Sequence, residues 1–195
     1  IEHLAGLKLH LANSGVDLRN PDHAAKLGRV FAKADDFGMP IIIHLRTRNE
    51  AYGARDARIF IEQVLSQAPD VTVQVAHLGG WSGMDEATRA VVDTFAAALE
   101  RSEDGALDGL LFDTAETVIP ESRVKGREAL VERVREVNRR TAEAIRQLGP
   151  ERVVFGSDWV APAELAPRAN ALARDLPLPE GIIADLADNR APYLD

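Results

Sequence analysis

Three residues that can bind a metal ion or transfer a proton follow runs of strand-forming residues. His44 ends the run PIIIH, His77 ends the run VTVQVAH, and Asp158 ends the run VVFGSD. In a barrel of parallel strands, the carboxyl ends of the strands share one rim, so residues far apart in the sequence can meet there. The pattern therefore predicts that His44, His77 and Asp158 converge on one ion or one substrate.

The elements that must position these residues alternate between strand-like and helix-like segments. Strands are predicted at residues 6–10, before His44, before His77, at 110–114 and at 153–156. Helices are predicted at residues 21–37, 56–68 and 85–101, in a long stretch ending near residue 148, after Pro162, after Pro179 and at 184–194. This alternation is typical of βα units that build a parallel sheet with outer helices.

The length of the chain bounds the architecture. With 195 residues, 46% of them hydrophobic, residues 1–195 can form a single domain, and two small domains are the less favoured alternative. A complete (β/α)₈ barrel needs roughly 250 residues and each βα unit takes about 30. Because the chain starts at Ile1 and not at Met, we expect about three further units upstream. The favoured fold is therefore α/β, an incomplete TIM barrel, with an open doubly wound sheet as the alternative.

Composition excludes several classes of function. The net charge is −8 and the sequence has no basic cluster, so nucleic acid is not an expected partner. The apolar runs are much shorter than the ~20 residues that cross a membrane. With no cysteine, disulfides and thiolate ligands are excluded, and a metal site must use nitrogen and oxygen donors. The sequence does not assign a compartment: cytoplasmic, or periplasmic or secreted if a signal peptide preceded Ile1.

Five segments, in order, resemble the later strands of the amidohydrolase superfamily, and specifically its amidohydrolase 2 family of metal-dependent TIM-barrel hydrolases and decarboxylases. The segments are GLKLH at residues 6–10, IH at 43–44, AHLG at 76–79, FDT at 112–114 and FGSDW at 155–159. The similarity extends over almost the whole chain. It implies that the five strands correspond to strands four to eight of the barrel.

The resemblance also implies roles for the three opening residues. His44 would coordinate a divalent metal, His77 would be a second ligand or would orient and deprotonate the attacking water, and Asp158 would bind the metal and act as a general base or proton shuttle. These roles agree with the chemistry, since a divalent ion lowers the pKa of bound water towards ~7 and a nearby carboxylate or imidazole can then move its protons. Zn²⁺ is the favoured ion, with Mn²⁺ or Fe²⁺ as alternatives.

The sequence departs from the family at one point. The family's first strand carries a His-x-His pair that supplies two more metal ligands, and this sequence contains no His-x-His. We therefore expect the chain alone to bind metal weakly, with an upstream segment or a partner subunit completing the site. An open barrel exposes strand edges, so the isolated chain is expected to associate. A non-catalytic barrel remnant or partner subunit is the competing hypothesis.

Further residues are candidates for substrate binding. Lys8 and His10 alternate with leucines and should face the barrel interior together, and the resemblance also permits a carboxylated Lys8 that bridges two metals. Arg46 follows His44 and suits a carboxylate-bearing small molecule, while Trp159 follows Asp158 and could stack on a flat substrate. Solvated or purely packed side chains remain the alternative for each of these residues.

Four other residues have two interpretations each. Asp113, at the end of the fourth strand, could bind substrate or orient a ligand, or could make a structural hydrogen bond. Gly79 and Gly80 could cradle an anion, although a plain turn is favoured. Trp81 could wall off the site or simply pack.

The leading functional hypothesis is a metal-dependent hydrolase of amide, lactone or ester bonds in a small organic substrate. A decarboxylase of the same family is the alternative, because both activities use the same metal, histidine and aspartate groups. A nucleotide-binding domain is disfavoured because no glycine-rich phosphate-binding motif follows a strand.

Overall fold

The computed structural model describes residues 4–102, 105–158 and 162–194, with the side chains of 162–164 left out. Its centre is a sheet of five parallel strands in the order β1-β2-β3-β4-β5, so each strand pairs with the next one along the chain. The strands are β1 (Leu7–His10), β2 (Ile41–His44), β3 (Val73–Val75), β4 (Leu110–Asp113) and β5 (Val153–Val154).

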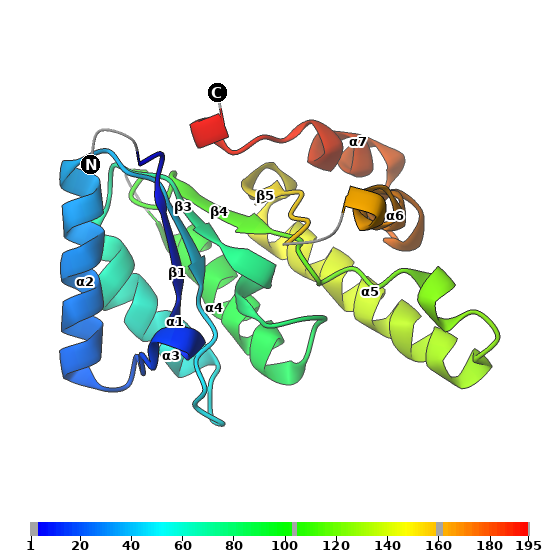
Figure 1. Ribbon diagram of the computed structural model, residues 1–195, viewed down its shortest axis with the longest axis horizontal. Coiled ribbons are helices and arrows are strands. Elements are labelled where there is room, and N and C mark those ends of the chain that lie inside the picture. Colours follow the sequence, from blue (N-terminus) through cyan, green and yellow to red (C-terminus); the bar gives the residue numbers. More distant parts are fainter. Residues whose placement is uncertain (1–3, 103–104, 159–161, 195) are drawn as a thin grey trace.

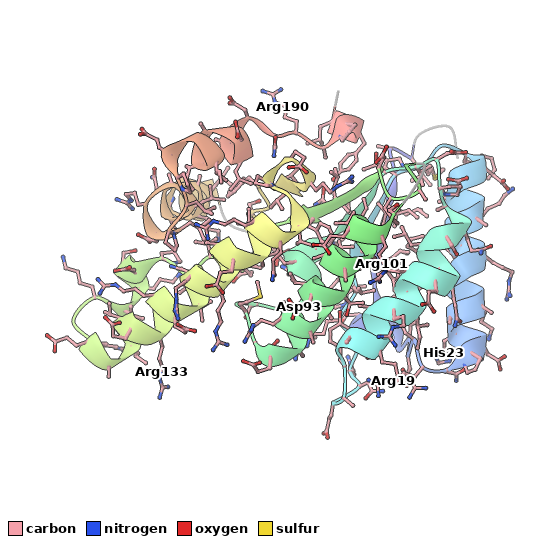
Figure 2. All side chains as sticks on the ribbon, turned by 180° about the vertical axis from the view of Figure 1, so that it is seen from behind. Arg19, His23, Asp93, Arg101, Arg133 and Arg190 are labelled. Atoms are coloured by element: carbon pink, nitrogen blue, oxygen red, sulfur yellow. The ribbon has the colours of Figure 1, made fainter. Side chains whose placement is uncertain are left out.

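Helices connect the strands and cover one face of the sheet (Figures 1 and 2). The helices between strands are α1 (Leu11–Ser14), α2 (Pro21–Asp36), α3 (Ala54–Ile59), α4 (Glu86–Arg101) and α5 (Glu128–Leu148), and the last strand is followed by α6 (Pro162–Asp175) and α7 (Glu180–Asp188). A π-helical turn (Phe60–Val64) and a 3-10 turn (Leu65–Gln67) prolong α3. Other 3-10 turns lie at Glu121–Val124, Pro150–Arg152 and Pro192–Leu194. This parallel sheet with outer helices confirms the predicted α/β class and matches part of a (β/α)₈ barrel.

The start of α2 shows how the sequence sets an element boundary. The side chain of Asn20 accepts hydrogen bonds from the backbone N–H groups of Asp22 and His23, and Pro21 occupies the first turn. Both features stabilise a helix N-terminus, since they satisfy or remove N–H groups that have no partner within the helix. The predicted cap is confirmed.

The core lies between the sheet and helices α2 to α5. Alternate strand residues such as Ile41 and Ile43 are fully buried against the helices. Figure 2 looks onto the outside of this helix layer, where the labelled Asp93 and Arg101 are exposed on α4. Among the described residues, no helix is long and apolar enough to cross a bilayer.

Three predicted boundaries are wrong. The third strand ends at Val75 and not at His77, and the fifth ends at Val154 and not at Gly156. The predicted helix at 184–194 is instead the second half of α7, which ends at Asp188. The reason is the next residue, Asn189, whose side-chain amide donates to the carbonyls of Pro150 and Val153 and so ties the chain to the start of β5.

Candidate functional site

The first two strands end side by side in histidines. The parallel register pairs His10 with His44, and because side chains alternate along a strand, both rings lie on the face opposite the helix-packed isoleucines. The rings stack with their centroids 3.9 Å apart and their planes 13° from parallel. The predicted interior orientation of Lys8 and His10 agrees with their place in the lining of a common pocket.

His44 is the most deeply placed of these groups. It is 4% exposed, and its Nε2 is buried without a hydrogen-bond partner among the described residues. Burial first, and then the neighbouring His10 and His77, lowers the pKa of His44 to about 3. The ring is therefore neutral near pH 7, which is the form in which imidazole binds a metal.

His77 lies two residues beyond β3 in a turn (Ala76–Gly79) and is 5% exposed. Its backbone is left-handed, with φ 56° and ψ 34°. Its Nδ1 lies 2.9 Å from the carbonyl oxygen of Ala115. Because a carbonyl can only accept, Nδ1 carries the hydrogen, which leaves the lone pair of a neutral ring on Nε2. The centroids of His77 and His44 are 5.0 Å apart.

Asp158 reaches the same pocket from a loop. It lies four residues beyond β5, is exposed, and has a left-handed backbone with φ 55°. Non-glycine residues rarely adopt this conformation, and where they do the strain is frequently at functional positions. Among the described non-glycine residues, only His77, Leu78, Glu116 and Asp158 have positive φ. Three of these four line the pocket.

These side chains surround a pocket of about 440 Å³. Its lining consists of Lys8, His10, His44, His77, Trp81, Ser82, Glu116 and Asp158. Trp81 is half exposed and stands edge-on to His44, with ring centroids 5.1 Å apart. The pocket thus combines nitrogen donors, two carboxylates, one lysine and one aromatic wall.

One residue predicted to bind substrate, Arg46, is not in this lining. Arg46 pairs with Asp85, with an N–O distance of 2.7 Å, and its guanidinium lies over the ring of Tyr52. Trp159 lies outside the described residues. Gly79 and Gly80 are explained by packing, since a Cβ on Gly79 would lie 2.6 Å from Val91 Cγ1, and one on Gly80 would lie 2.4 Å from Thr88 Oγ1.

Sequence reasoning missed two pocket residues. Glu116 has a left-handed backbone and is held by an ion pair with Arg168 of α6. Ser82 is an exposed residue of the loop that carries Trp81. The only signal in the sequence was their position two and five residues beyond a predicted strand end, which does not separate them from ordinary loop residues.

His10 differs from the other two histidines in its hydrogen bonding. Its Nδ1 accepts from the backbone N–H of Asn13, at 3.4 Å, at the start of α1. In the neutral ring the hydrogen then sits on Nε2, so this nitrogen is a hydrogen-bond donor. Burial first, and then Lys8, lowers the pKa of His10.

The comparisons with known proteins place this geometry in a family. The family model described as amidohydrolase, of the amidohydrolase 2 type, matches residues 2–191. The chain belongs to the amidohydrolase family. Members of this family are generally hydrolase-type enzymes that use divalent metal ions.

A solved structure resembles this amidohydrolase chain. Amidohydrolase 2 from Bifidobacterium longum subsp. infantis superposes with a TM-score of 0.51 and 21% sequence identity, over 97% of this chain and 61% of its own. At this identity the likeness establishes the fold alone. The chain spans about 61% of the length of that relative. No curated protein sequence matches the chain.

The residues of the pocket fit part of a metal site. The buried, unpartnered Nε2 of His44 and the fixed ring of His77 are two nitrogen donors of the kind that bind Zn²⁺. Within residues 4–102, 105–158 and 162–194, however, no three His, Asp or Glu side chains are close enough together to hold an ion. Asp158 shares the pocket with the histidines without completing such a group.

Proposed function

We propose that this amidohydrolase chain forms one wall of the active site of a metal-dependent hydrolase that cleaves an amide, lactone or ester bond in a small organic substrate. The observation that carries the proposal is the buried and unpartnered Nε2 of His44 beside the ring of His77. Leaving a buried polar atom unpaired costs about 1–3 kcal/mol, and a bound metal ion would offset that cost.

His44 and His77 would hold the metal through their Nε2 atoms. The favoured ion is Zn²⁺, because imidazole nitrogens suit it, with Mn²⁺ or Fe²⁺ as alternatives. When bound, such an ion lowers the pKa of a water molecule to about 7 and polarises a carbonyl group. Since the described residues supply only part of a ligand set, the remaining donors would come from another segment of the barrel or from a partner subunit.

Asp158 would move the protons, and His77 would share this task only if its Nε2 faces the attacking water instead of binding the metal. The carboxylate of Asp158 is exposed to the pocket and can accept a proton from the attacking water and return it to the leaving group. The ring of His77 is fixed through Nδ1, so its Nε2 keeps one direction while this exchange takes place.

The substrate would be a small molecule that bears a carboxylate. Lys8 supplies a positive charge in the lining, and His10 supplies an N–H donor beside it. Arg46 could join them only if it left Asp85, to which it is paired. Trp81 offers an apolar edge that limits the size of the substrate, and Trp159 stays a sequence-based prediction.

Metal binding to histidine variants tests this proposal. We expect Zn²⁺ titrated into the chain to shift the ring nitrogen resonances of His44 and His77, and His44→Gln or His77→Asn to weaken the binding by about 10-fold or more. His23→Gln is the matched control, because His23 lies at the start of α2 (Figure 2) and does not line the pocket. Equal Zn²⁺ affinity in all these variants would contradict the proposal.

The catalytic step has its own measurement. In the protein that contains the complete barrel, hydrolysis of a panel of carboxylate-bearing lactones and amides should fall by about 100-fold or more in Asp158→Asn, because the general base is lost. Unchanged turnover in this variant would show that Asp158 does not move the proton.

A further inference from the structure

Asp113, the last residue of β4, gathers three N–H donors although it does not line the pocket. Its Oδ1 accepts from the backbone N–H of His77 at 2.9 Å and from that of Ala115 at 3.1 Å. Its Oδ2 accepts from the side-chain amide of Gln74 at 2.7 Å. Asp113 is 4% exposed, so these bonds replace the water that a carboxylate normally binds.

Hydrogen bonds join Asp113 to the ring of His77 through Ala115 and also join Asp113 directly to the backbone of His77. Ala115 donates its N–H to Asp113, and its carbonyl accepts from Nδ1 of His77. The same carboxylate oxygen also holds the backbone N–H of His77. Asp113 therefore fixes both the backbone that carries the imidazole and the carbonyl that orients it.

The backbone of His77 needs such support. His77 and Leu78 are consecutive left-handed residues, with φ of 56° and 51°. This conformation is unfavourable for residues with a Cβ, so it persists only where the surroundings stabilise it. A buried negative oxygen that accepts the N–H of His77 provides that stabilisation.

Two further residues hold Asp113 from the other side. The hydroxyl of Tyr193, near the end of the chain, donates to Oε1 of Gln74, which leaves the amide nitrogen of Gln74 directed at Asp113. Burial first, and then the charge of Asp113, raises the pKa of Tyr193, so its hydroxyl remains a donor. The chain of contacts runs from Tyr193 through Gln74 and Asp113 to His77.

The loop that leads to Asp158 packs on the same carboxylate. A Cβ built on Gly156 would lie 2.9 Å from the Cβ, Cγ and Oδ1 atoms of Asp113. Only glycine permits this approach, so the position of Asp113 is coupled to the loop that carries the proposed general base.

We propose that Asp113 is a positioning residue, which holds the backbone and ring of His77 in their observed orientation. The hydrogen bond from Tyr193 to Gln74 keeps the side-chain amide of Gln74 directed at Asp113 and so stabilises the position of Asp113. The inference rests on the proposed role of His77 in the active site. Its consequence is that the C-terminal segment controls which nitrogen of His77 carries the hydrogen, although Tyr193 does not touch that ring.

The test is the tautomer of His77, measured from its ring ¹⁵N chemical shifts in the full chain without metal or substrate. The wild type should show the Nδ1–H form. Asp113→Ala should give a mixture of tautomers and at least about 10-fold faster exchange of the His77 backbone amide, because its acceptor is lost. Asp113→Asn keeps the shape and one acceptor oxygen and should be intermediate, and it carries the test if the alanine variant does not fold.

Two more variants separate positioning from general stability. Tyr193→Phe should shift the tautomer in the same direction by a smaller amount. Asn138→Ala removes a buried side chain that bonds both backbone groups of Ile119, and it should lower the melting temperature while leaving the His77 tautomer unchanged.

The proposal is overturned if Asp113→Asn and Tyr193→Phe both retain the wild-type tautomer and amide exchange, or if Asn138→Ala alters them equally. Because no metal is present when the tautomer is measured, an unchanged tautomer in the variants would reject the positioning role of Asp113 but not the proposed metal site. If the histidine variants bind Zn²⁺ as well as the wild type while the tautomer shifts as expected, the metal site is rejected but the positioning role of Asp113 is not.

Discussion

The two faces of the sheet are built from the same strands but differ in their side chains and surroundings. On β2, Ile41 and Ile43 are fully buried against the helices, whereas His44 faces the pocket. The strand alternation therefore places apolar packing on one face and the polar residues of the pocket on the other. Moving the register by one residue would exchange the two faces.

Each face also carries a row of rings. On the outer face, four phenylalanines meet edge to face, with centroid distances of 5.6, 6.2 and 5.2 Å along the row Phe31, Phe60, Phe95 and Phe112. On the inner face lie the rings of His10, His44 and His77, with centroid distances of 3.9 Å from His10 to His44 and 5.0 Å from His44 to His77. The outer row contains only hydrocarbon rings, whereas the inner row includes the buried Nε2 of His44, which has no hydrogen-bond partner among the described residues.

Phe95→Ala tests the outer row and should have the largest effect. Phe95 is fully buried and joins Phe60 to Phe112, so its truncation should lower the free energy of unfolding by about 3–5 kcal/mol, as measured by urea denaturation. Phe37→Ala is the control, since Phe37 is half exposed and should cost much less. Similar losses in both variants would mean that the row is not a unit of the core.

Gly156→Ala tests the close contact between the loop that leads to Asp158 and the side chain of Asp113. The new Cβ would overlap Asp113, so we expect a loss of about 1–3 kcal/mol in the free energy of unfolding. Gly181→Ala, in α7, meets no atom within 4 Å and should be neutral or stabilising by up to about 1 kcal/mol. A neutral Gly156→Ala would show that Asp113 can move freely.

His44→Leu should sharpen the contrast by acting in the opposite direction from Phe95→Ala. It removes the unpaired Nε2 and keeps apolar volume, so stability in the absence of metal should rise by roughly 1 kcal/mol while Zn²⁺ binding is lost. Thermal unfolding with and without Zn²⁺ measures both effects. A large destabilisation without metal would mean that His44 supports the fold itself.

Asp85 gives the smallest expected effect and a dependence on pH. Burial raises the pKa of Asp85. The hydrogen bonds from Thr88 and the contact with Arg46 together lower the pKa by more than burial raises it, so the net shift is downward. The folded state then binds this proton less readily than the unfolded state, and stability is lost as pH falls through the folded pKa.

Asp85→Asn should therefore flatten the acid limb of the stability curve below about pH 4. Because the Asp85 side chain is half exposed, the difference should be only about 0.5 kcal/mol. Urea midpoints measured between pH 7 and pH 3 for both proteins would show it. An unchanged slope would mean that the contacts of the Asp85 carboxylate with Thr88 and Arg46 contribute nothing to the pH dependence of stability.

The sequence predicted the strands and helices because apolar periodicity and caps are local signals, whereas the order of the strands was implied by the family resemblance. His44 could be placed for the same reason, since it is the last residue of its strand. His77 was expected on a strand, yet its turn depends on Asp113, which is 36 residues further along the chain. Arg46 was expected at the substrate, but its partner Asp85 is 39 residues away. Such long-range polar contacts leave no periodic pattern in the sequence.

The left-handed backbone of His77 also determines which substitutions can remove its ring cleanly. Alanine at this position would bring its own backbone penalty and combine two defects in one variant. Asparagine adopts the same dihedral angles more readily and, like histidine, has a polar side chain. A mutational scan of this amidohydrolase should therefore use asparagine as the reference for His77, and a loss seen only with alanine would report on the turn and not on the imidazole.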